Sequence, residues 1–230
     1  MKSERYARSE ALLGEGSTER LKQAHVAVFG LGGVGSFTVE ALTRMGVGKL
    51  TLIDGDAYSE SNLNRQLFAT EKTLGEPKTD AAAKRVREVN SEVEVFTHNL
   101  FVTPENLDTI DFSAFDYIAD AIDTVSAKIA IIGRADALKI PVISAMGAGN
   151  KTDPTLFRVA DIAKTKVCPL ARAVRNGLRR EGILHTKVVY SEEEPVNLEA
   201  KESRVPASAS FIPSVMGLIM AGEIIKDLLK

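Results

Sequence analysis

Short apolar runs alternate with longer amphipathic stretches along most of the chain, beginning at His25. Val26-Ala27-Val28-Phe29 and Leu50-Thr51-Leu52-Ile53 are almost continuously apolar, as parallel strands are when helices cover both of their faces. This alternation predicts an α/β fold with a mostly parallel sheet flanked by helices. We expect strands at 25–29, 49–53, 93–98, 117–121 and 142–145, and helices at 33–45, 77–90, 125–138, 169–181 and 214–229.

Two stretches near the end of the chain depart from this pattern. Residues 191–209 combine three consecutive glutamates, two prolines and a Ser/Ala-rich run, which offer little to bury and predict a mobile loop over a site. The apolar stretch 211–225 is interrupted by proline, glycine and glutamate and is shorter than the ~20 residues of a membrane span. We therefore expect a core helix near 214–229 and no stable membrane insertion.

Length and composition narrow the class of protein. A chain of 230 residues with 44% hydrophobic composition can form one substantial core, so we expect one domain over residues 1–230. The net charge of −2 argues against a wholly basic nucleic-acid binder. The one cysteine, Cys168, excludes an intrachain disulfide and a zinc site of paired Cys-x-x-Cys motifs. Charges throughout the first thirty residues argue against a signal peptide and favour the cytoplasm.

The most informative local motif is Gly30-Leu31-Gly32-Gly33-Val34-Gly35, which follows an expected strand and opens an expected helix. Its four glycines permit a tight turn and let a phosphate approach N–H groups at the positive end of the helix. Asp54 ends the next strand about 20 residues later, where a carboxylate can bind ribose hydroxyls. The pair predicts a Rossmann-like nucleotide site, with a ligand-free glycine turn as the alternative. The glycines that contribute to the predicted site are Gly30, Gly32, Gly33 and Gly35.

Polar residues after the second and fourth strands favour phosphate chemistry. Displacement of pyrophosphate builds negative charge that Arg65 and Lys78 can stabilise, whereas hydride transfer needs no such cations. Asp123, at the end of a parallel strand, can hold Mg²⁺ together with phosphates. The alternative makes Arg65 and Lys78 solvated charges and Asp123 a helix N-cap. The hypothesis requires both cations to lie near the glycine turn.

The motifs occur in an ordered combination. Arg5-Tyr6-Ala7-Arg8, GLGGVGS, IDGD, SNLNRQ, GEPK and AIDT follow one another within about residues 5–145. This combination resembles the nucleotide-binding half of the ubiquitin-activating and ThiF/MoeB adenylyltransferase superfamily, so it implies a ThiF-type domain that binds ATP and Mg²⁺. The resemblance implies that Gly33 approaches the phosphates and Asp54 binds ribose. The remaining residues in these motifs to which we assign nucleotide contacts are Asp56, Asn62, Arg65, Gln66 and Lys78, with Asp123 as the magnesium ligand.

Arg8 carries a further implication of the resemblance. It matches an arginine that, in this superfamily, reaches into the nucleotide site of the neighbouring subunit. The resemblance therefore implies a homodimer in which Arg8 acts in catalysis with Arg65, Lys78 and Asp123. An ordinary surface charge on an N-terminal helix is the alternative.

The second half of the chain resembles a narrower group. Ile143-Ser144-Ala145-Met146-Gly147-Ala148-Gly149-Asn150-Lys151, Asp153-Pro154, residues 157–161 and Pro169-Leu170-Ala171-Arg172 are similar to the tRNA threonylcarbamoyladenosine dehydratases. The resemblance implies ATP-dependent cyclisation of the threonylcarbamoyl group at adenosine 37 through an acyl-adenylate, in a ligase-type reaction. The implied partner is a threonylcarbamoylated, ANN-decoding tRNA, and a sulfur-relay or cysteine desulfurase partner is also compatible.

A basic segment gives independent support for an RNA partner. Residues 164–187 contain seven lysines and arginines and one acidic residue, Glu181. Arg172, Arg175 and Arg179 share one face of the expected helix and could follow a phosphate backbone. A solvated helix face is the alternative.

Three other functions fit parts of the sequence. Adenylation of the C-terminus of a ubiquitin-like or sulfur-carrier protein uses the same nucleotide motifs. An NAD-dependent oxidoreductase explains only the glycine motif and Asp54. A non-catalytic nucleotide-sensing or RNA-binding module would bind ATP without turnover. Cys168 precedes an expected helix, where a thiol pKa can fall, but the sequence offers no identified histidine partner.

Overall fold

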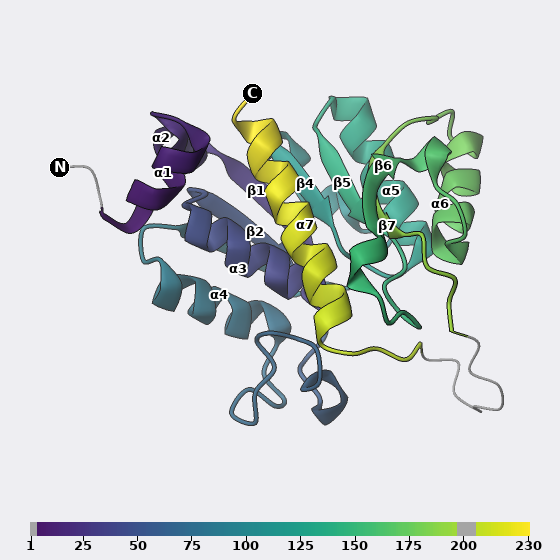
Figure 1. Cartoon of the computed structure of the whole chain (residues 1–230), viewed down its shortest axis with the longest axis horizontal. Coiled ribbons are helices and arrows are strands. Elements are labelled where there is room, and N and C mark those ends of the chain that lie inside the picture. Colours follow the sequence, from purple (N-terminus) through teal and green to yellow (C-terminus); the bar gives the residue numbers. More distant parts are fainter. Residues whose placement is uncertain (1–3, 197–205) are drawn as a thin grey trace.

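One seven-stranded sheet with the order β3-β2-β1-β4-β5-β7-β6 forms the centre of the molecule (Figure 1). It is seen in a computed structural model that describes residues 4–196 and 206–230. Only β6 runs antiparallel to its neighbour β7, so the predicted Rossmann-like, mostly parallel fold is confirmed. The strands are β1 His25–Phe29, β2 Lys49–Ile53, β3 Glu94–His98, β4 Tyr117–Asp120, β5 Val142–Ala145, β6 Phe157–Asp161 and β7 Lys187–Ser191.

Helices cover both faces of the sheet. One face packs against α3, α4 and α7, whose apolar residues share a core with the strands, and the other face packs against α5 and α6. Figure 1 shows α7 lying beside α3, and these two helices make the most extensive helix contact in the described part of the chain. The helices are α1 Ala7–Leu13, α2 Ser17–Gln23, α3 Gly35–Met45, α4 Lys78–Val89, α5 Val125–Leu138, α6 Pro169–Arg180 and α7 Phe211–Leu228.

Some element boundaries differ from the sequence prediction. Helix α3 begins at Gly35 and not at residue 33, because the first glycines form the turn itself. Helix α7 begins at Phe211 and not at residue 214, because Pro213 lies in the first turn, where its missing N–H has no partner to lose. Helix α2 and strands β6 and β7 were not among the expected elements, and α1 corresponds only to the N-terminal helix considered for Arg8.

The segment predicted as a loop at 191–209 is partly described. Ser191 belongs to β7, which corrects the start of the prediction. Residues 192–196 and 206–209 have no regular structure, and residues 197–205 lie outside the described residues. The core helix is confirmed as α7, with Ile212, Met216 and Met220 fully buried. No helix in the described ranges has the length and apolar character needed to cross a membrane.

Close backbone packing brings α7 onto the start of α3. A Cβ on Gly217 would lie 2.3 Å from the carbonyl oxygen of Val34, so only glycine allows this approach. Thr38 donates a 3.1 Å hydrogen bond to the Gly217 carbonyl. Pro213 packs against Gly33, and a Cβ on Gly33 would lie 3.0 Å from the Cγ of Pro213. The last helix therefore supports the glycine turn directly.

Asp227 fixes the other end of α7 to the sheet. It accepts hydrogen bonds from Tyr117 over 2.8 Å, from Lys187 over 2.5 Å and from Lys230 over 2.7 Å. Burial raises the pKa of Asp227, but hydrogen bonds from the two lysines and the tyrosine outweigh burial and lower this pKa to about 2. The ionised carboxylate is thus stabilised in the folded state.

Replacing Asp227 with asparagine is expected to reduce stability in a pH-dependent way. Because the folded pKa lies below the unfolded value, the carboxylate contributes stability above about pH 4 and loses it as the pH falls towards 2. We expect Asp227→Asn to lower the free energy of unfolding by about 1–2 kcal/mol at pH 7 after allowance for solvent screening. Urea unfolding of both proteins between pH 7 and 3 measures the difference.

Asp136→Asn is the matched control, since Asp136 is half exposed and pairs only with Lys139 over 4.0 Å. It should change stability little at any pH. A loss for Asp227→Asn that stays constant down to pH 3 would contradict the assignment.

Candidate active site

The chain adds β2 and β3 on one side of β1 and then β4 and β5 on the other side, so the strand order reverses between β1 and β4. Open α/β sheets bind ligands at such a switch point. Gly30 follows β1 with a φ of +86°, and a Cβ there would lie 2.7 Å from the carbonyl oxygen of Ala121, which follows β4. A Cβ on Gly35 would lie 1.7 Å from the Gly30 carbonyl oxygen. Backbone packing therefore requires glycine at both positions and fixes the shape of the turn.

The N-terminus of α3, which follows the glycine turn, has no side-chain cap. Val34 is the N-cap of α3 and provides no side-chain cap. Among the described residues, no acceptor takes a hydrogen bond from the N–H groups of Gly32, Gly33 or Val34. Unpaired N–H groups at the positive end of a helix form an anion site, so a phosphate fits here.

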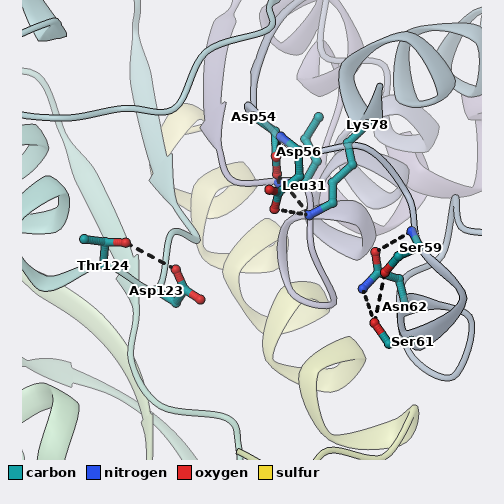
Figure 2. A network of polar contacts seen from close by, with 9 residues as sticks. All are labelled: Leu31, Asp54, Asp56, Ser59, Ser61, Asn62, Lys78, Asp123 and Thr124. Carbon is teal, nitrogen blue, oxygen red and sulfur yellow. Dashed lines mark hydrogen bonds and ion pairs between the residues drawn. The ribbon is translucent and has the colours of Figure 1, made fainter. Parts of the chain in front are cut away.

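Asp54 and Lys78 form a charged cluster beside the turn (Figure 2). Asp54 accepts hydrogen bonds from Leu31 N over 2.7 Å and from Asp56 N over 2.8 Å, so it ties the turn to the end of β2. The Lys78 ammonium is 2.8 Å from Asp56 Oδ2 and 3.8 Å from Asp54 Oδ2, and Lys78 is buried. Lys78 thus lies at the site as predicted, but it is paired with carboxylates.

Arg65 also lies beside the glycine turn. Its Cγ is 3.4 Å from the position of a Cβ on Gly33, and its guanidinium donates to Ser61 O over 2.8 Å and to Asn64 Oδ1 over 2.9 Å. Lys78 and the Cγ of Arg65 therefore lie beside the glycine turn, and the Arg65 guanidinium bonds to exposed acceptors on the segment that follows β2.

Two further polar residues occupy the segment before Lys78. The side-chain oxygen Oδ1 of Asn62 accepts a hydrogen bond from Ser59 N over 3.1 Å, which closes a capping box on the short helix Glu60–Asn62. Gln66 is buried, and its Oε1 has no hydrogen-bond partner among the described residues. Its Nε2 is 3.8 Å from the position of a Cβ on Gly32. Within the described ranges, Gln66 is thus a buried amide with one unsatisfied oxygen in the segment beside the turn.

Asp123 is drawn apart from these clusters in Figure 2, and no dashed line joins it to them. Its carboxylate is exposed and has only a long 3.5 Å contact from Thr124 Oγ1. Thr124, and not Asp123, is the N-cap of α5, so the capping alternative is wrong. The described residues hold no cluster of three metal-ligating side chains. One free carboxylate fits Mg²⁺ when phosphate oxygens supply the other ligands.

Arg8 lies far from the glycine turn of its own chain. Tyr6 packs on Gly46 at the end of α3, and Arg5 donates to Asn90 at the end of α4. The eleven residues of α3 separate this end from the turn by about 16 Å. Arg8 is exposed on α1, so the structure does not bring it to the other predicted catalytic residues of the same chain.

The basic helix α6 is only partly available to a partner. Arg175 donates to Thr165 O over 3.1 Å and to Thr165 Oγ1 over 2.5 Å, so its guanidinium serves the protein itself. Arg172 and Arg179 are exposed and have no partner among the described residues. Cys168 is buried as the N-cap of α6, where its sulfur accepts from Ala171 N over 3.5 Å. This contact explains the cysteine structurally.

Comparison with known proteins agrees with this geometry. The model of the ThiF family matches residues 6–230. The chain belongs to the ThiF family. Among ThiF-family relatives, a tRNA threonylcarbamoyladenosine dehydratase of Bacillus subtilis is 43% identical over 98% of this chain and 94% of its own length. The resemblance drawn from the sequence is thus confirmed.

Solved structures of the ThiF family have the same fold over almost the whole chain. The E. coli tRNA N6-threonylcarbamoyladenosine dehydratase in complex with ATP has a TM-score of 0.91 and 34% identity, covering 98% of this chain and 93% of its own. The same enzyme in complex with AMP has a TM-score of 0.90 and 34% identity, covering 98% and 94%.

Two glycine substitutions should separate folding from nucleotide binding. Gly35→Ala places a methyl group inside a backbone contact and should lower the melting temperature strongly. Gly32→Ala meets nothing closer than Gln66 at 3.8 Å, so it should fold normally but weaken ATP binding about tenfold or more. Differential scanning fluorimetry and calorimetric titration with ATP measure the two effects.

Gly222→Ala is the control, because a Cβ there meets nothing within 4 Å. It should leave ATP affinity unchanged and keep or slightly raise the melting temperature, because alanine favours a helix interior over glycine. Normal ATP affinity in Gly32→Ala would show that no phosphate lies against this part of the turn.

Proposed function

We propose that this protein uses ATP to cyclise the threonylcarbamoyl group at adenosine 37 of tRNA, with AMP and pyrophosphate as the nucleotide products. The observation that carries the proposal is the match of almost the whole chain to tRNA threonylcarbamoyladenosine dehydratases. The open turn at Gly32 and Gly33 supports it, because that turn offers unpaired donors for phosphate oxygens. The proposed setting is the cytoplasm, and the reaction is of the ligase type.

The chemistry proceeds in two steps. A carboxylate oxygen of the threonyl group attacks the α-phosphorus, a new P–O bond forms, and pyrophosphate leaves with the electrons of the broken P–O bond. A nitrogen of the threonylcarbamoyl group then attacks the activated carbonyl, gives up its proton, and displaces AMP. Both reacting groups belong to one nucleoside, so the second step is effectively unimolecular and needs no protein thioester. The nucleoside loses one water overall.

The charges of the side chains near the turn suggest how a triphosphate would be bound. Asp54, Asp56 and Lys78 together carry one excess negative charge, which alone would repel a nucleotide. Arg65 supplies a further cation beside the turn. Its guanidinium can exchange its exposed hydrogen bonds to Ser61 O and Asn64 Oδ1 for bonds to phosphate oxygens. Asp123 would hold Mg²⁺, which neutralises phosphate charge and polarises the α-phosphorus when bound.

A homodimer would supply the remaining cation. Arg8 lies beyond the far end of α3 from its own turn, so any role in catalysis requires the site of a second copy. An arginine delivered to the α-phosphate would stabilise the charge that develops there. A sulfur-relay or cysteine desulfurase protein remains a further proposed partner.

The tRNA is proposed to lie across α6 and the short helix Ile162–Lys164. Arg172 and Arg179 provide exposed charges without protein partners in the described ranges, and Lys164 and Lys166 extend the surface. Arg175 lies on the same helix, with part of its guanidinium already bonded to Thr165. Such a surface would bind the phosphate backbone and would depend on salt.

Arg65→Ala should abolish the reaction while leaving the fold intact. We expect pyrophosphate release in the presence of threonylcarbamoylated tRNA to fall about 100- to 1000-fold, as when one charge-stabilising donor is removed. Mass analysis of the nucleosides should show the loss of one water with the wild-type protein and none with the variant. Arg44→Ala, which removes an exposed arginine bonded to Glu40, is the matched control.

Mixing variants tests the dimer in the same assay. Arg65→Ala and Arg8→Ala proteins, each inactive alone, should regain about a quarter of wild-type activity when their subunits exchange, because half of the dimers then contain one complete site. ATP–pyrophosphate exchange that responds to a carrier protein and ignores tRNA would replace the proposed substrate by the alternative one.

Substitutions on α6 should weaken tRNA binding without affecting ATP. Arg172→Ala with Arg179→Ala should reduce tRNA affinity, and the slope of log K against log salt should fall by about one per lost phosphate contact. Filter binding at several salt concentrations measures both quantities. Arg44→Ala together with Arg134→Ala removes two exposed arginines elsewhere and should have little effect. Equal losses in both pairs would indicate only a general charge effect.

A further inference from the structure

Three polar side chains form a fully buried cluster next to the end of β4, the strand that leads to Asp123. The Lys128 ammonium donates to Asp120 Oδ2 over 3.0 Å and to Ser144 Oγ over 3.1 Å. Ser144 Oγ donates to the same carboxylate oxygen over 2.6 Å. All three residues are 0% exposed. We call Asp120, Lys128 and Ser144 the buried triad.

The fold brings the buried triad together from three elements. Asp120 is the last residue of β4 and is the register partner of Ser144 in β5, so the two side chains lie side by side on one face of the sheet. Ile118 packs among α5 residues, and alternation along the strand places Asp120 on that same face. Lys128 reaches them from the start of α5.

Stability does not account for this arrangement. Taking two charges out of water costs free energy that their attraction often fails to return, and apolar residues of similar size are commonly as stable. Lys128 also lies near the N-terminus of α5, where the helix macrodipole disfavours a cation. An effect on local conformation is the better explanation.

The buried triad is connected to the turn that carries Asp123. Asp120 Oδ1, the oxygen not used by Lys128, accepts from Ile122 N over 3.2 Å. On the opposite side, Ala121 N donates to Phe29 O over 2.8 Å, and the Ala121 carbonyl contacts Gly30. The chain between β4 and Asp123 is thus held by the triad and by the glycine turn together.

We infer that the buried triad is a positioning device that holds residues 121–124 so that Asp123 faces the nucleotide crevice. Asp123 itself has only the weak Thr124 contact, so its place depends on the backbone that precedes it. The ligand side of this inference rests on the proposed function, in which Asp123 binds Mg²⁺ with the nucleotide.

An apolar triple variant tests the inference. Asp120→Val, Lys128→Met and Ser144→Ala keep the volume roughly constant and leave no unpaired buried charge, so the melting temperature should stay the same or rise. Hydrogen exchange at the amides of residues 121–124 in the ligand-free protein should nevertheless become about tenfold faster. Tyr6→Phe, which removes a buried 2.7 Å hydrogen bond with Asn90, is the control and should not change exchange at these amides.

A double-mutant cycle with Asp123→Asn tests the ligand side. ATP affinity in Mg²⁺ divided by ATP affinity in EDTA should fall about tenfold in the triple variant and in Asp123→Asn, with no further loss when they are combined. Additive losses, or a normal ratio in the triple variant, would overturn the inference. A normal ratio in Asp123→Asn would instead refute the proposed metal role of Asp123, and the exchange data would still judge the triad.

A single variant covers the case in which the triple variant does not fold. Ser144→Ala keeps the ion pair and removes the two hydrogen bonds that Ser144 Oγ makes with Lys128 and Asp120. Faster exchange at residues 121–124 with a smaller fall in the same affinity ratio would support the inference. A lower melting temperature with unchanged exchange and ratio would assign the triad a structural role only and overturn it.

Discussion

The backbone contact between Gly30 and Ala121 is the constraint on which the site depends. It closes the first strand onto the fourth so tightly that a Cβ at residue 30 would lie 2.7 Å from the facing carbonyl oxygen. The phosphate turn and the Asp123 turn therefore form a single unit at the switch point of the sheet. Gly35 continues the same packing into α3, so the positive end of that helix is fixed relative to both turns.

The two aspartates and the two cations beside the glycine turn nearly cancel each other's charge in the ligand-free protein. Lys78 is buried between Asp54 and Asp56, and its pairing avoids an isolated ammonium in a place with little water. The glycine turn contributes partial positive charge from its N–H groups, and Arg65 contributes an ion that can turn towards it. A triphosphate carries more charge than these can neutralise, so a metal ion and a second subunit are natural complements to this site.

Sequence reasoning succeeded where local chemistry dictates structure. The apolar strands and the glycines at residues 30 and 35 carry their own explanation, because a turn packed this closely on a neighbouring strand admits only glycine. It did not predict which charged side chains would bond to other elements of the fold. Arg175 donates hydrogen bonds to Thr165, and Lys128 donates to Asp120 and Ser144, and neither set of contacts can be read from the helical pattern. A charged residue ending the apolar run Tyr117-Ile118-Ala119 was the available signal.

Helix α7 shows why such distant contacts matter for the site. Its first turn packs against Gly33, its Gly217 lies against the Val34 carbonyl, and its last turn is fixed to the sheet through Asp227. Apolar residues alone would allow this helix to slide or rotate on α3, but a glycine contact at one end and an ion-paired carboxylate at the other define a single register. The far end of the chain therefore supports the glycine turn, and a nucleotide bound there as proposed would be sensitive to changes in α7 packing.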